Sequence, residues 1–335
     1  MSSSRKKQAS APALNPAQIA GLRKELGLAQ KRAEQASIDG RWEDAVKHRE
    51  VALEQSAAVH GEQALETTRA VYDLGLAHYD VGELAVEKAQ GCFQQALVLF
   101  SALLAEDAEL LGNVYLGLGN CFMAKEEWSA AMAMYTRVAT VLEQAHGKDH
   151  FGLVSVYVNI GLALFHQQRL DDALELYGRA LRLAESVLGS DKLETADIYH
   201  NIGVVYHMRN QMPSALRMYG KALAVRLNVL GEDHLTTALV YGNIAQIYEE
   251  QGKWKEAYGL QMKVRKIRET RLGATSLLTA ETYFHLGKIY AAVGRHGDAV
   301  KILTRALRIR RRAHGNDDDA EPVQEVLAAL RDLGR

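Results

Sequence analysis

A period of 42 residues runs through most of this chain of 335 residues. Five tyrosines keep the period: Tyr115, Tyr157, Tyr199, Tyr241 and Tyr283. A glycine and an alanine keep it as well, at Gly147, Gly189, Gly231, Gly273 and Gly315 and at Ala131, Ala173, Ala215, Ala257 and Ala299. A fixed period of this length is typical of repeat proteins, in which stacked units bury one continuous core. Because repeat proteins mostly bind other macromolecules, the period favours an interaction protein and leaves its partner open.

The composition fits a helical chain. Hydrophobic residues make up 48% of the sequence, which is enough for a continuous core. The four prolines are Pro12, Pro16, Pro213 and Pro322. Since proline inside a helix removes a hydrogen bond, such scarcity predicts a nearly all-α protein. No apolar run reaches the roughly 18 residues of a membrane span, and no apolar signal-peptide core follows Met1. We therefore expect a cytoplasmic protein without a membrane span.

Residues 193–231 illustrate one repeat. Apolar residues recur at steps of three, four and seven over residues 198–206, which predicts an amphipathic helix, here called helix A. Pro213 stands where a second helix, helix B, begins, a position at which its missing N–H group costs nothing. Gly231 ends helix B and predicts a left-handed C-terminal cap. The polar residues 232–234 then provide hydrogen-bond acceptors for the start of the next helix.

Small residues predict close packing of the two helices. We expect Gly203 of helix A to face Ala215 of helix B, so that the two backbones approach each other. Tyr219 would then fill the space between successive hairpins. One hairpin cannot bury its apolar face alone, so stability requires stacked neighbours.

Several positions of the fourth unit form a recognisable set: Tyr157, Ile160, Gly161, Leu164, Ala173, Tyr177 and Ala180, after the loop Gly147-Lys148-Asp149-His150. The loop recurs as Gly231-Glu232-Asp233-His234 and more loosely at residues 189–192. This pattern resembles the tetratricopeptide repeat, in particular the 42-residue form found in kinesin light chains. The resemblance is strong over residues 109–316. It is weaker over residues 17–108, where residues 82–90 look like an insertion between two helices.

The resemblance implies an all-α, right-handed superhelical solenoid of about seven tetratricopeptide hairpins. Residues 1–16 would be a flexible tail and residues 17–316 the solenoid, divergent over 17–108 and regular over 109–316. Residues 317–335 would form an acidic turn and a capping helix. Kinesin light chains also carry a heptad coiled coil before their repeats. No comparable series of heptads exists here, so the role of a motor subunit does not transfer.

In tetratricopeptide folds the A helices line a concave groove that holds extended peptides. Asn159, Asn201 and Asn243 keep the 42-residue step on helix A, and His285 is next in line. In related repeats an asparagine at this position holds the peptide backbone, because an amide offers both a donor and an acceptor. The alternative is that each asparagine satisfies a carbonyl of a neighbouring helix. The predicted groove also contains Asp197, His200, Gln246, Glu249, Glu250, Glu281 and Lys288.

Known ligand classes of the family do not transfer to this groove. The positions that clamp an acidic C-terminus in co-chaperones hold Val158, Leu162, His200 and Val204 here. Kinesin light chains favour aromatic peptides flanked by acidic residues, and the carboxylates of this groove would disfavour such a ligand. The sequence therefore predicts a peptide or protein partner without identifying it.

Charge is unevenly distributed along the chain. Residues 253–312 carry 15 Lys and Arg against 4 Asp and Glu, whereas residues 25–252 carry 18 against 31. This asymmetry predicts a basic docking surface for an acidic partner such as a tubulin tail. The alternative is a solvated face with local ion pairs. Nucleic acid is the weakest candidate, because the nearby aromatic residues belong to helix packing or to the groove. The surface comprises Lys263, Arg265, Arg268, Arg305, Arg308, Arg311 and Arg312.

No motif predicts chemistry. The two cysteines, Cys92 and Cys121, have no metal-type spacing and are expected to be reduced thiols, with a disulfide between neighbouring helices as the alternative. No zinc-protease, P-loop, dinucleotide or nucleophile-elbow pattern occurs. We therefore expect no enzymatic activity, no cofactor and no metal. The sequence predicts an adaptor or scaffold that binds a peptide. The alternative is a structural component of a cytoskeletal or ciliary assembly, docked through its basic C-terminal third.

Overall fold

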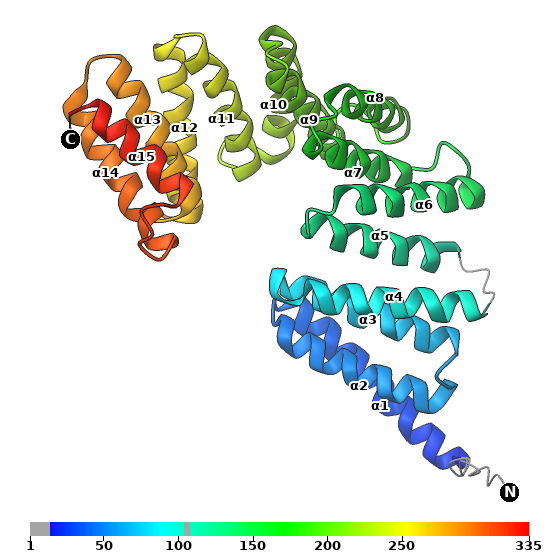
Figure 1. Cartoon of the computed structure of the whole chain (residues 1–335). Coiled ribbons are helices and arrows are strands. Elements are labelled where there is room, and N and C mark those ends of the chain that lie inside the picture. The colour runs from blue at the N-terminus through cyan, green and yellow to red at the C-terminus, as the bar shows by residue number, and fades with distance from the viewer. Residues whose placement is uncertain (1–13, 104–107, 335) are drawn as a thin grey trace, which may run out of the picture. The chain divides into compact units, whose positions relative to one another are not determined.

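A computed structural model describes residues 14–103 and 108–334 of the chain. These residues form 15 α-helices, one short 3-10 helix and no strand (Figure 1). The chain divides into two compact units, Met1–Gln167 and Gln168–Arg335. The all-α prediction is therefore confirmed. Most of the predicted N-terminal tail lies outside the described residues.

In the first unit each helix packs against the next one along the chain. The insertion predicted at residues 82–90 is shorter than expected, because only a 3-10 helix separates α3 from α4 and residues 86–90 already belong to α4. The elements are α1 (Pro16–Ile38), α2 (Trp42–His60), α3 (Leu65–Val81), η1 (Glu83–Ala85), α4 (Val86–Leu103), α5 (Ala108–Ala124), α6 (Trp128–His146) and α7 (Gly152–His166).

The second unit continues the alternation of A and B helices. Here α9, α11 and α13 are A helices, and α10, α12 and α14 are the B helices that pack against them. The last helix, α15, buries Val323, Val326 and Leu330 in one cluster with residues of α14. The elements are α8 (Leu170–Val187), α9 (Leu193–Met208), α10 (Met212–Leu230), α11 (Leu235–Glu250), α12 (Trp254–Leu272), α13 (Leu277–Ala292), α14 (His296–Ala313) and α15 (Glu321–Asp332).

The loop glycines adopt a backbone conformation other than the predicted left-handed cap. Gly231 has φ 83° and ψ 178°, and Gly147 has φ 86° and ψ 173°. This extended region with positive φ is almost closed to residues that carry a Cβ atom, so glycine is required even more strictly than a left-handed cap requires it. The acceptor predicted after the glycine is confirmed at His234, whose Nδ1 accepts a hydrogen bond from the Thr236 N–H group at 3.2 Å.

A buried threonine fixes each of three loops from the other side. The hydroxyls of Thr195, Thr237 and Thr279 donate to the carbonyls of the glycines six residues earlier, at 2.7, 3.0 and 2.8 Å. Each bond ties a loop to the first turn of the following A helix. The threonines keep the 42-residue step, a signal that the sequence analysis missed.

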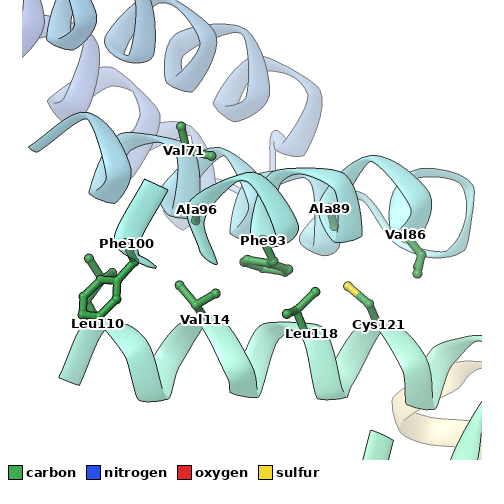
Figure 2. Close-up of a cluster of buried hydrophobic side chains, with 10 residues drawn as sticks. All are labelled: Val71, Val86, Ala89, Phe93, Ala96, Phe100, Leu110, Val114, Leu118 and Cys121. Atoms are coloured by element: carbon green, nitrogen blue, oxygen red, sulfur yellow. The ribbon is translucent and has the colours of Figure 1, made fainter. Parts of the chain in front are cut away.

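The core of the first unit shows how neighbouring hairpins bury their apolar faces. Figure 2 shows Val114, Leu118 and Cys121 of α5 pointing toward α4, where Phe93 lies at the centre. Phe93 is fully buried. Burial raises the pKa of the Cys121 thiol to about 11. Both cysteines are free, so the alternative of a disulfide is not realised.

The glycine of helix A accommodates a large residue of its own hairpin. A Cβ atom placed on Gly203 would lie 2.6 Å from the ring of Tyr219, and one placed on Gly119 would lie 2.5 Å from the ring of Tyr135. The atoms nearest to the Cβ position of Gly203 belong to Tyr219 and not, as predicted, to Ala215. Tyr219 also lies in one buried cluster with Val240 and Ile244 of α11, so it fills the space between successive hairpins as predicted. The tyrosine ring lies on the helix A backbone, and only glycine leaves room for it.

The periodic tyrosine of helix A connects two hairpins. The Tyr283 hydroxyl donates to the Glu269 carboxylate on the preceding helix B at 2.6 Å, and Tyr199 donates to Glu185 in the same way. Burial, and then this hydrogen bond, raise the pKa of both tyrosines to about 12. The ring is also covered by a cation of its own helix B, which for Tyr283 is the Arg305 guanidinium at 4.6 Å from the ring centroid.

The covering cation recurs with the tyrosine. Arg137 lies 5.6 Å above Tyr115, Lys221 lies 4.7 Å above Tyr199, and Lys263 lies 5.0 Å above Tyr241. These basic residues follow the 42-residue step, as do the tyrosines beneath them. A cation over an aromatic face contributes about 0.5–1 kcal/mol at exposed sites. This contact therefore explains why Lys and Arg recur at the 42-residue step in helix B, and no binding partner is needed to explain it.

We expect Gly203→Ala to lower the free energy of unfolding by about 1–3 kcal/mol, because the new methyl group overlaps the Tyr219 ring. Gly220→Ala on α10 is the matched control, since nothing lies within 4 Å of the added atom. Denaturant unfolding of both variants measures the difference. Equal midpoints for Gly203→Ala and the parent chain would contradict the packing described here.

We expect Tyr283→Phe to cost about 1–2 kcal/mol, because the variant loses the 2.6 Å hydrogen bond to Glu269. Tyr241→Phe should cost less, since the Tyr241 hydroxyl is 3.5 Å from the exposed Glu232 carboxylate. Thermal unfolding of the two variants side by side tests the order. A larger loss for Tyr241→Phe would show that the hydroxyl–carboxylate bond is not what connects the hairpins.

Candidate functional site

The candidate site is a polar surface on the three A helices of the second unit. We call it the A face and define it by Asn201, His200 and His207 of α9, Asn243, Gln246 and Glu250 of α11, and His285 and Lys288 of α13. The residues of α11 are spaced i, i+3 and i+7, so they lie on one side of that helix. Hydrogen bonds between side chains of successive A helices hold the surface together.

His200 connects two of the predicted asparagines. The Asn243 side-chain N–H group donates to Nε2 of His200 at 2.8 Å, so the imidazole proton is on Nδ1, which lies 3.5 Å from the Asn201 side-chain oxygen. Burial, and then the nearby Arg226 guanidinium, lower the pKa of His200 to about 4. The ring is therefore neutral near pH 7. It leaves the Asn201 amide nitrogen and the Asn243 amide oxygen without a partner among the described residues.

A second cluster lies one to two turns further along the same helices. His207 Nε2 is 2.9 Å from Glu250 Oε2, and Gln246 Nε2 is 3.3 Å from Glu250 Oε1. Because a carboxylate only accepts hydrogen bonds, both nitrogens act as donors. The Glu250 side chain remains 38% exposed. Glu250 is thus held in one position and still open to solvent.

The sixth repeat departs from the pattern beside this surface. Ala245 and Gln261 occupy the places that Gly203 and Tyr219 hold one repeat earlier. The Gln261 amide donates to Oε1 of the buried Glu249 at 3.1 Å, and His285 Nδ1 donates to Oε2 of the same carboxylate at 2.9 Å. Glu249, predicted as a groove residue, is therefore buried and holds His285 in position.

Two other predicted groove carboxylates pair with buried arginines. Asp197 accepts from Arg226 at 2.6 Å, and Glu281 accepts from Arg268 at 2.8 Å. Arg226 and Arg268 are 4% and 8% exposed and also donate to backbone carbonyls at the start of the next helix. These pairs fix loops between helices. We therefore leave Asp197 out of the A face.

The remaining groove predictions are placed as follows. Lys288 is exposed on α13, with its ammonium 5.7 Å from the centroid of the Phe284 ring. Asn159 lies half-buried on α7, which belongs to the first unit. Its participation in one row with Asn201 and Asn243 stays a prediction.

The predicted basic surface divides into buried, paired and open residues. Arg268 is buried and is removed from it, because its guanidinium stabilises the α12–α13 loop. Lys263 pairs with Glu232, Arg265 with Glu269, and Arg311 with Asp318. The cations that remain exposed on one side of α14 are Lys301, Arg308 and Arg312, together with Arg305, whose guanidinium also lies 4.0 Å from the Glu269 carboxylate.

Charge separates between the A and B helices of the three hairpins α9–α10, α11–α12 and α13–α14. The A helices α9, α11 and α13 carry five Asp and Glu and one Lys. The B helices α10, α12 and α14 carry 15 Lys and Arg and three Asp and Glu. The A helices therefore attract cationic partners, and the B helices attract anionic partners.

Two surveys of the described residues bear on other kinds of site. Over residues 14–103 and 108–334, no helix combines the length and the apolar character that a membrane crossing requires. In the same ranges no group of three or more His, Cys, Asp or Glu side chains is arranged to hold a metal ion.

Sequence reasoning missed two residues that shape the A face. His207 was not placed in the predicted groove, although its spacing of seven from His200 places both on one side of α9. Gln261 was not singled out, although it is a polar residue at a position that holds tyrosine in the preceding repeat. In both cases the signal was present in the spacing.

Comparison with known proteins supports the repeat assignment. Residues 152–228, 211–269 and 236–312 match the family model described as tetratricopeptide repeat. Among curated protein sequences, none matches the chain.

Solved structures share the fold at low sequence identity. BtubC (BKLC) from P. vanneervenii is 21% identical, with a TM-score of 0.60 over 70% of this chain and 94% of that chain. A putative kinesin light chain from Podosopora anserina is 17% identical, with a TM-score of 0.52 over 62% of this chain and 99% of that chain. The apo form of RapI is 13% identical, with a TM-score of 0.64 over 93% of this chain and 86% of that chain.

The low pKa of His200 makes stability depend on pH. Below its unfolded value of about 6.5 the unfolded chain takes up a proton that the folded chain accepts only near pH 4. Stability is therefore lost as pH falls through this window. We expect the free energy of unfolding to drop by up to about 3 kcal/mol more in the parent chain than in His200→Gln. Unfolding curves at both ends of the window test this, and equal losses would contradict it.

Proposed function

This chain is a tetratricopeptide-repeat protein of the 42-residue, kinesin-light-chain-like type, and we propose that it is an adaptor or scaffold that captures an extended peptide on the A face. Tetratricopeptide repeats are interaction scaffolds and are generally not enzymes. The proposal assigns the binding of a partner to α9, α11 and α13 of the second unit.

The observation that carries the proposal is the group Asn201–His200–Asn243. An extended peptide has unpaired backbone N–H and C=O groups, and an amide side chain can pair with both. His200 fixes the orientation of both amides and leaves a donor on Asn201 and an acceptor on Asn243. Since the two side chains are already ordered, binding does not have to pay for fixing them.

A second candidate function rests on the exposed cations of α14. Lys301, Arg305, Arg308 and Arg312 are spaced i, i+4, i+7 and i+11, so they form one stripe along the helix. Such a stripe suits an acidic protein surface, for example a tubulin tail, in a cytoskeletal or ciliary assembly. Exposed charges are screened within about 8–10 Å at physiological salt, so this mode would be strongly salt-dependent.

We expect Asn201→Ala/Asn243→Ala to weaken binding of the main partner at least roughly ten-fold, because two hydrogen-bonding positions are lost. Affinity purification with mass spectrometry identifies the partner, and titration of the purified partner gives the affinity. Asn228→Ala, an exposed amide on the B helix α10, is the matched control. Lys301→Glu/Arg308→Glu/Arg312→Glu tests the second candidate.

The two candidates predict opposite results. Loss of binding in the double asparagine variant alone, with little effect of added salt, supports capture on the A face. Loss of binding in the charge-reversed variant alone, with a steep salt dependence, would contradict it and support docking through α14.

A further inference from the structure

The carboxylates of the A helices are neutralised to different degrees. Asp197 and Glu281 each pair with a guanidinium, and Glu249 is buried between Gln261 and His285. Glu250 has no Lys or Arg partner among the described residues. It differs from Asp197 and Glu281 because no guanidinium neutralises it, and from Glu249 because its side chain is exposed to solvent.

Glu250 is also held in place without being neutralised. Its two oxygens accept hydrogen bonds from His207 on α9 and Gln246 on α11, at 2.9 and 3.3 Å. Neither donor brings a permanent positive charge. Glu194, the other exposed acidic residue of these helices, lies in the first turn of α9 and has neither a cationic partner nor a hydrogen-bonding side chain to fix it among the described residues. The Glu250 carboxylate is therefore ordered and exposed, and no Lys or Arg of the described residues pairs with it.

From this arrangement we propose that Glu250, with His207 and Gln246, is a subsite that selects a Lys or Arg side chain of the captured peptide. The inference rests on the proposed function, since it takes the A face as the surface that holds the peptide. A cationic side chain would approach the 38% exposed carboxylate and complete its hydrogen bonding.

The helix geometry sets where the basic residue stands in the peptide. Glu250 follows Asn243 by seven residues, which at 1.5 Å per residue places them about 10 Å apart along α11. An extended peptide advances about 3.3 Å per residue. For a peptide segment that runs parallel to α11, the Lys or Arg therefore stands about three residues from the residue whose backbone pairs with Asn243.

The charge distribution of the second unit also favours a basic peptide on the A face. The A helices carry a surplus of carboxylates and the B helices a surplus of Lys and Arg. A cationic peptide is thus attracted to the A face and repelled from the B helices. An acidic peptide would be repelled from the A face and attracted to the B helices.

Selection from a random-peptide phage library on the full chain tests the subsite. We expect the selected peptides to share a Lys or Arg at one fixed position. Replacing that residue with Gln in a synthetic selected peptide should weaken binding to the parent chain roughly two- to five-fold. The same replacement should change nothing for the Glu250→Gln variant. Glu256→Gln, an exposed carboxylate on α12, is the matched control and should behave like the parent.

The outcomes separate this inference from the proposed function. Glu250→Lys should shift the selected position to Asp or Glu, while circular dichroism confirms that the variant is folded. If peptides bind and Asn243→Ala abolishes their binding, but no basic residue is selected or Glu250→Gln keeps the preference, the subsite is wrong and the A-face function stands. If no peptide binds, or binding is indifferent to Asn243→Ala, both are wrong.

Discussion

Hydrogen bonds from the periodic tyrosines Tyr157, Tyr199 and Tyr283 to the preceding helix B connect successive hairpins. Tyr283 reaches back to Glu269 through its hydroxyl, and its ring is covered by Arg305 of its own hairpin. One side chain thus fixes the spacing between three helices. Because a hairpin cannot bury its apolar face alone, contacts between hairpins must recur along the chain, and the 42-residue period reflects this requirement.

The same constraint explains where the chain is free to vary. The positions of the tyrosine, the hairpin glycine and the buried arginine are constrained by packing between helices. Tyr219 packs on Gly203, and Arg226 donates a hydrogen bond to the start of the next A helix. The A face has no such packing role, and apart from the asparagines its residues differ between repeats. Glu250 occupies the place of Met208 one repeat earlier. The sixth repeat even replaces the glycine–tyrosine pair by Ala245 and Gln261, which connects its core to His285.

Local chemistry made much of the fold predictable from sequence. Helical periodicity, Pro213 and the loop glycines located the hairpins, because each acts within a few residues of its own position. Contacts between hairpins were harder to predict. Nothing local distinguishes Arg268, which is buried, from Arg308, which is exposed, since that difference depends on the carbonyl and carboxylate that the next hairpin brings to Arg268.

The candidate site shows the same division. The row of asparagines followed from the period alone. The role of His200, and the pairing of His207 with Glu250, depend on a side chain 43 residues away meeting its partner across two helices. A sequence gives the residue types of such a pair, while only the stacking of the repeats brings them within 3 Å.

The central claim is that the A face of the second unit contacts the partner. Site-specific photo-crosslinking tests it directly, with a photoreactive residue placed at the exposed Gln246 on α11 or at the exposed Arg217 on α10. The account predicts crosslinks to an extended segment of the partner from position 246 and none from position 217. Crosslinks from position 217 alone would show that the partner binds the B helices, and the assignment of the binding surface would be wrong.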